Sequence, residues 1–124
     1  MLDTHTFIWW HENPTLLSAK VLAICEDVNN QLILSMVSLW EIQIKLQLNK
    51  LTLDHSLTEM VKIQRNNGIE ILPIKFEHIL RLDNLPLYHK DPFDRLLIAQ
   101  ATIEQLTLLT KDEKFKLYSQ PIIW

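Results

Sequence analysis

Four acidic residues from widely separated parts of this 124-residue chain could act together. They are Asp3, Glu41, Asp94 and Asp112. Carboxylates gathered at one place repel one another and raise one another's pKa unless a cation neutralises them. Hard divalent ions prefer carboxylate and water oxygens, so the implied cofactor is Mg²⁺ or Mn²⁺, as one ion or two. Such an ion neutralises phosphodiester oxygens and acidifies a bound water, which is the chemistry of phosphodiester hydrolysis.

Two acids near the start of a predicted helix, Asp91 and Asp94, can also have a purely structural role. Asp91 precedes Pro92 and is a natural N-cap, so the sequence leaves open whether it is a cap or a metal ligand. Asp94 follows three residues later, where a carboxylate completes a capping box and complements the helix dipole. Together with the other acids, Asp94 is interpreted as a ligand.

The remaining acids can be interpreted in the same two ways. Glu41 can pair with Lys45 across one helical turn, and Asp112 can belong to an ordinary turn. Asp3 is the hardest to explain structurally, because it stands among apolar residues, where a carboxylate without a partner is costly to bury.

The elements that must position these acids alternate between short apolar runs and helical periodicity. Strands are expected at 1–2, 31–35, 69–74, 106–110 and 121–124, and helices at 18–28, 38–46, 57–66, 76–82 and 91–101. This alternation predicts an α/β fold, a three-layer α/β/α sandwich around a central parallel sheet of four to five strands. Because sites in such sheets form beyond the carboxyl ends of the strands, the four acids are expected to converge there. A first strand of two residues is shorter than usual, so residues are expected to be missing before Met1.

The bulk composition is that of one globular domain, residues 1–124. Apolar residues make up 48% of the chain and the net charge is −3, which argues against binding nucleic acid through bulk positive charge. The single cysteine allows no internal disulfide, and no apolar run is long enough to cross a membrane. A cytoplasmic protein is therefore expected.

Four segments, in order, resemble the successive motifs of VapC-like PIN domains. They are LDTH at 2–5, SLWEI at 38–42, HKDPFDRLLIAQA at 89–101 and LTLLTKD at 106–112. The resemblance implies an α/β/α sandwich with Mg²⁺-dependent endoribonuclease activity, the toxin of a type II toxin–antitoxin pair. It also implies an RNA substrate, a homodimer and a cognate antitoxin protein.

Site residues follow from the same resemblance by position. It assigns catalysis and metal binding to the acidic quartet Asp3, Glu41, Asp94 and Asp112. Thr4 and Thr110 match the hydroxyl residues that orient the quartet, and Asp91 stands beside them as a further candidate ligand.

Particular residues argue against two other classes of α/β protein. A haloacid-dehalogenase-type phosphatase needs a second Asp where His5 stands, and a receiver domain needs a carboxylate where the third strand ends in Pro73-Ile74. The five histidines show no metal-ligand spacing, and His89 is at most an RNA contact. The remaining alternative is a catalytically silent PIN-like scaffold that binds RNA or a protein partner.

The N-terminal segment predicts an interface. Phe7, Ile8, Trp9 and Trp10 form a continuous apolar run, and one helix face cannot bury all four against a single sheet. We therefore expect part of this run to be exposed and covered by a second copy of the chain or by the antitoxin.

Overall fold

The strands are short and all pair in parallel. The computed structural model describes residues 1–124 and contains β1 (Ile33–Ser35), β2 (Glu70–Leu72), β3 (Leu108–Leu109) and β4 (Ile122–Ile123). β1 pairs with β2 and β3 pairs with β4, each in a two-stranded sheet. Parallel strands joined through helices make this an α/β fold, as predicted.

Leu2 connects the two sheets. It forms isolated parallel bridges to Leu34 on one side and Leu109 on the other. Its backbone N–H donates to Ile33 O at 2.9 Å, and Leu109 N–H donates to Met1 O at 2.8 Å. The single sheet of four to five strands that the sequence predicted is thus not present as such, because only one residue pairs where a middle strand was expected.

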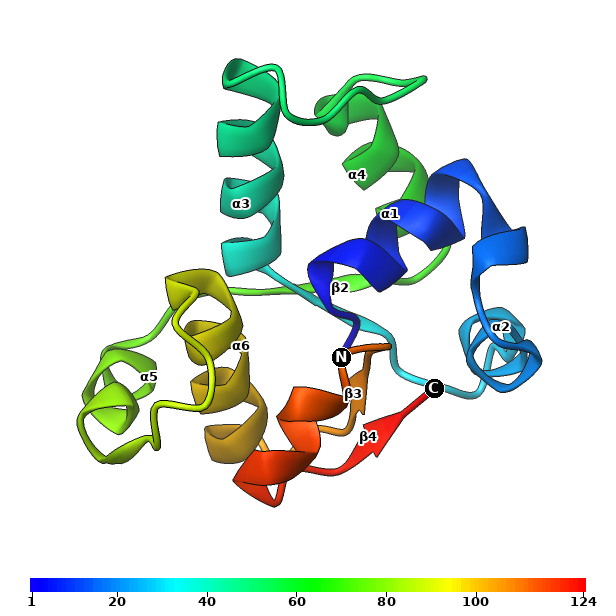
Figure 1. Ribbon diagram of the computed structural model, residues 1–124. Coiled ribbons are helices and arrows are strands. Elements are labelled where there is room, and N and C mark those ends of the chain that lie inside the picture. Colours follow the sequence, from blue (N-terminus) through cyan, green and yellow to red (C-terminus); the bar gives the residue numbers. More distant parts are fainter.

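Six α-helices and three 3₁₀ helices surround these strands (Figure 1). The α-helices are α1 (Thr4–Glu12), α2 (Ala19–Glu26), α3 (Met36–Gln47), α4 (Leu57–Asn66), α5 (Phe76–Arg81) and α6 (Pro92–Ile103). The 3₁₀ helices are η1 (Pro14–Leu16), η2 (Leu82–Asn84) and η3 (Glu113–Tyr118). No helix is long and apolar enough to cross a membrane.

Side-chain caps fix where the helices begin. Ser18 caps α2, Ser56 forms a capping box with Glu59 on α4, and Asp91 caps α6 through Phe93 N–H. α3 begins two residues before the predicted start because the hydroxyl of Ser35 accepts from Val37 N–H. η3 was not predicted, since its segment has no helical apolar stripe.

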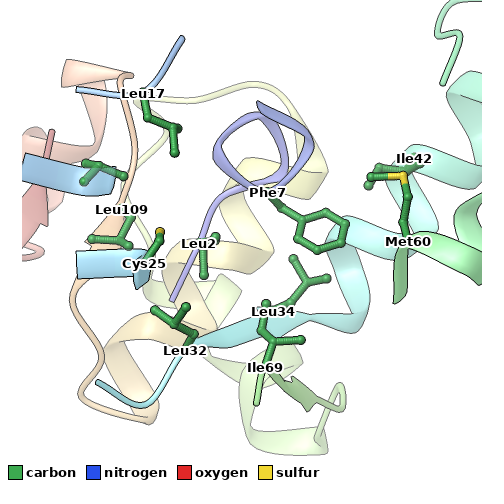
Figure 2. Packing of buried hydrophobic residues seen from close by; sticks show 11 residues of the cluster. Leu2, Phe7, Leu17, Cys25, Leu32, Leu34, Ile42, Met60, Ile69 and Leu109 are labelled. Carbon is green, nitrogen blue, oxygen red and sulfur yellow. The ribbon is translucent and has the colours of Figure 1, made fainter. Parts of the chain in front are cut away.

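Two apolar clusters form the core. Figure 2 shows the first, in which Leu2, Phe7 and Leu34 lie together with residues of α2, α3 and α4. The second cluster is built on α6, whose Leu97 and Ile98 are almost completely buried. The first cluster therefore packs around Leu2 and the strands that pair with it, and the second cluster fixes α6.

The N-terminal apolar run is better covered than expected. Phe7 is fully buried, and Ile8, Trp9 and Trp10 are half-buried against the first cluster. The largest exposed apolar side chains lie elsewhere, among them Phe76 on α5 (71% exposed). The run is thus mainly part of the core, since α1 packs against several elements instead of one sheet.

Candidate metal centre

Asp94 lies in the first turn of α6, where acidic groups surround it. The pKa of its carboxyl group is raised to about 6, mainly by burial and then by the charges of Asp91, Glu41 and Asp112, while His89 opposes the rise. Asp94, Glu41 and Asp112, which are distant in sequence, therefore lie close enough to repel one another. The structure thus brings Asp94 near Glu41 and Asp112, and a metal site shared by the quartet Asp3, Glu41, Asp94 and Asp112 stays a prediction.

Asp112 is held by both side-chain oxygens. Its Oδ1 accepts from Lys114 N–H at 2.9 Å and caps η3, and its Oδ2 lies 2.9 Å from His89 Nε2. Burial acts to raise the pKa of Asp112, but the hydrogen bonds from His89 and Lys114 outweigh it and leave the pKa below its ordinary value. Asp112 therefore ionises at a lower pH than its neighbour Asp94.

Glu41 is buried on α3, with only 5% of its surface exposed. Its Oε1 is 2.6 Å from Lys45 Nζ, the ion pair that the sequence offered as the structural interpretation. Its Oε2 accepts from the hydroxyl of Thr4, which also lies 3.0 Å from Ser38 Oγ. Both oxygens are thus positioned by the chain itself, one of them by a cation.

Asp3 caps α1, a role that the sequence analysis missed. Its Oδ1 accepts from Thr6 N–H at 2.7 Å. Burial raises the pKa of its carboxyl group, and hydrogen bonds from Thr110 and Thr6 oppose that rise. Since Thr110 Oγ1 also accepts from Asp112 N–H at 3.1 Å, one threonine hydroxyl connects Asp3 to Asp112.

Asp91 is exposed at the start of α6. Its Oδ1 accepts from Phe93 N–H at 2.8 Å, which is the cap predicted from the Asp-Pro pair. It contributes negative charge to Asp94 but makes no other side-chain hydrogen bond. The structure therefore gives Asp91 the geometry of a cap.

His89 is the residue of this cluster that the sequence analysis did not select. One nitrogen or carboxylate oxygen from each of His89, Asp94 and Asp112 lies within 4.8 Å of the others. His89 is 5% exposed, and Arg95 holds the segment before it by donating to the carbonyls of Pro86, Leu82 and Leu85. No spacing in the sequence could reveal it, because its partners come from η3.

Both ring nitrogens of His89 have partners. Nδ1 lies 3.1 Å from the hydroxyl of Tyr118, which can donate to it, so Nε2–H then donates to Asp112. In that tautomer the ring has no free lone pair for a metal ion. His89 therefore orients Asp112 and does not compete with it as a ligand.

The oxygen donors of this cluster suit a hard divalent cation. Asp3, Glu41, Asp94 and Asp112 offer oxygen donors, and the raised pKa of Asp94 reflects the charge that a cation would neutralise. Among the groups paired with the quartet's side chains, the only full cation is Lys45. A divalent ion would supply the missing charge.

Comparison with protein-family models matches residues 1–120 to the family described as PIN domain. A search of curated proteins found no match.

Proposed function

The chain belongs to the PIN-domain family, and from this premise we propose that it is a metal-dependent endoribonuclease that hydrolyses RNA phosphodiester bonds. PIN domains are generally metal-dependent nucleases. We propose Asp3, Glu41, Asp94 and Asp112 as the ligands of Mg²⁺, with Mn²⁺ able to replace it. The bound ion would supply charge neutralisation at the scissile phosphate and an acidified water.

The observation that carries this proposal is the raised pKa of Asp94 within a cluster of acidic groups. A carboxyl group whose pKa reaches about 6 beside three other acids is a site where burial and repulsion both favour a cation. Structural ion pairs can also perturb a pKa, but here no basic side chain is hydrogen-bonded to Asp94. A divalent ion relieves the repulsion among Asp94, Glu41 and Asp112 at once.

The other side chains have positioning roles in this proposal. Thr4 fixes one oxygen of Glu41, and the hydroxyl of Thr110 fixes Asp3 relative to Asp112. His89 holds Oδ2 of Asp112, so its replacement by Gln should weaken metal affinity by roughly 10- to 100-fold, as for other residues that orient ligands. Lys45 pairs with Oε1 of Glu41 and partly neutralises its charge.

The test is cleavage of a defined RNA by the purified chain. We expect cleavage with Mg²⁺ or Mn²⁺, none with a chelator, and none for Asp94→Asn with either metal. Asp83→Asn is the matched control, since Asp83 is an exposed acid on η2 without a side-chain hydrogen bond. If folded wild-type protein binds the RNA or a partner but does not cut under any of these conditions, the silent-scaffold alternative is correct.

We further propose that the nuclease is the toxin of a VapC-like toxin–antitoxin pair and is located in the cytoplasm. Expression in a bacterial host should then arrest growth, and Asp94→Asn or co-expression of the antitoxin should relieve the arrest. Growth unaffected by an active nuclease would refute the toxin role alone.

A homodimer is part of the same proposal. Exposed apolar side chains on α5 and on the segment after η2 support it, with Leu80 55% and Leu87 80% exposed. Phe76→Glu should shift the mass in solution from dimer to monomer, whereas Leu117→Glu, on η3, should not. A wild-type monomer would leave this surface to the antitoxin.

A further inference from the structure

A second group of metal-binding side chains lies at the other end of α1 from Asp3. His11 and Glu12 occupy the last turn of α1, and His55 lies in the connection before α4. One ligand atom from each lies within 4.8 Å of the others. Since His11 follows Asp3 by eight residues, the two groups are about 12 Å apart along the helix axis.

Two atoms of this group are buried without a hydrogen-bond partner. They are His11 Nε2 and Glu12 Oε1, and no other buried side-chain nitrogen or oxygen in the chain lacks one. The two atoms lie 3.8 Å apart, which is too long for a hydrogen bond, and the His11 side chain is only 7% exposed. Buried polar groups are normally satisfied, so these atoms point to a ligand between them.

Neighbouring groups hold both side chains in this orientation. Glu12 Oε2 accepts from Asp54 N–H at 2.8 Å, which leaves Oε1 free. His11 Nδ1 lies 3.2 Å from the side-chain amide of Gln64 on α4. Because amide nitrogen and oxygen exchange places by a half-turn, Gln64 can accept from Nδ1–H and leave a lone pair on Nε2.

We propose that His11 Nε2, Glu12 Oε1 and a ring nitrogen of His55 bind a zinc-class ion, distinct from the cation of the carboxylate cluster. Two imidazoles and one carboxylate suit Zn²⁺, whereas Mg²⁺ prefers oxygen ligands alone. In a tetrahedral site with bonds of about 2.0–2.1 Å, ligand atoms are about 3.3 Å apart. His55 is exposed, so rotation of its side chain closes the remaining gap, and water takes the fourth position.

Such an ion would connect α1 to α4. His11 and Glu12 belong to α1, while His55 directly precedes Ser56, the cap of α4. Without the ion, three contacts join these parts at this point. They are the Gln64 hydrogen bond to His11, the hydrogen bond from Asp54 N–H to Glu12, and the edge-to-face contact of the two histidine rings. The ion therefore acts as a structural clip, and its binding should raise the Tm of the whole domain.

The experiment uses Co²⁺ as a spectroscopic substitute for Zn²⁺, in full-length Asp94→Asn protein so that the carboxylate cluster competes less. We expect one equivalent of Co²⁺ to give the visible absorption of tetrahedral cobalt, and Zn²⁺ to remove it. Adding His55→Asn should abolish the absorption and the rise in Tm caused by Zn²⁺. Adding His5→Gln, which removes an exposed histidine of the same helix, should change neither.

A positioning variant gives an independent check. Gln64→Met should keep the cobalt spectrum but weaken affinity by roughly 10- to 100-fold, because Gln64 only orients His11. Absence of the spectrum and of a Tm rise in the Asp94→Asn protein would overturn the proposal. So would a spectrum that survives His55→Asn, since the metal would then lie elsewhere.

Discussion

Asp94 has a carboxyl group that the fold makes difficult to ionise without a cation. Its pKa of about 6 compares with an ordinary value of 3.8, so the unfolded chain releases this proton more readily than the folded one. The stability that Asp94 contributes is fully present below about pH 4 and is lost as the pH rises through 6. The same group that the proposed function needs therefore destabilises the metal-free protein at neutral pH.

Asp94→Asn should thus stabilise the metal-free protein at pH 7.5 by about 1–2 kcal/mol and leave it unchanged at pH 4. A shift of two pKa units corresponds to about 3 kcal/mol, reduced here because Asp94 is partly exposed to solvent. Urea unfolding in the presence of a chelator, at both pH values, measures the difference. Equal stability of the two proteins at pH 7.5 would mean that the fold does not raise the pKa of Asp94.

Trp40 is a residue at which RNA contact can be tested. It precedes Glu41, is 55% exposed, and contacts Phe93 edge-to-face with ring centroids 5.2 Å apart. A base stacked on an aromatic ring contributes about 1–3 kcal/mol, so Trp40→Ala should raise KM for RNA by roughly 5- to 100-fold with little change in kcat. Trp10→Phe, at a half-buried residue of α1 that packs against the first core cluster, is the control.

At the scale of elements, α6 is the helix on which the candidate site depends most. Leu97 and Ile98 bury α6 in the second core cluster, and Asp91 caps the helix. Asp94, in the first turn, therefore lies at the edge of that cluster. Asp91 thus caps the helix while Asp94 belongs to the candidate site, and substituting each residue alone can separate the two roles.

Asp91→Asn should keep both the stability and the nuclease activity of the protein, because Asn caps as well as Asp. Asp91→Ala should lower the free energy of unfolding by about 1 kcal/mol while the folded enzyme still cuts RNA. Chemical denaturation and cleavage rates measure the two effects. Loss of activity in Asp91→Asn to the level of Asp94→Asn would show that Asp91 binds the ion directly.

The sequence was informative where a local signal exists. The Asp-Pro pair predicted the cap of α6, and α4 was predicted at its observed bounds of Leu57–Asn66. The strand lengths and His89 could not be predicted, because they depend on pairing and contacts between distant segments. Asp3 is instructive, since an acid that seemed unexplained in the sequence is stabilised by Thr6 N–H within its own turn.

At the scale of the whole molecule, Leu2 holds the two sheets together. It is completely buried in the first core cluster, and its backbone is the only bridge between β1 and β3. One residue thus contributes to the core with its side chain and to sheet pairing with its backbone.

Leu2→Ala should lower the free energy of unfolding by about 2–5 kcal/mol, a large part of the stability of a domain this size. Leu87→Ala, at an 80% exposed position, should change it by less than about 0.5 kcal/mol. Denaturation followed by tryptophan fluorescence compares them. A small effect of Leu2→Ala would show that the core does not depend on this side chain.

The helix α1 carries Asp3 as its N-cap and His11 and Glu12 in its last turn. If both proposed ions bind, this helix connects the two sites, and thermodynamic linkage applies to the pair. Whatever factor Zn²⁺ at one end applies to the affinity for Mg²⁺ at the other, Mg²⁺ must apply to the affinity for Zn²⁺. One calorimetric cycle with both ions measures this coupling in either direction, and a factor of one would mean that the two ends of the helix bind their ions independently.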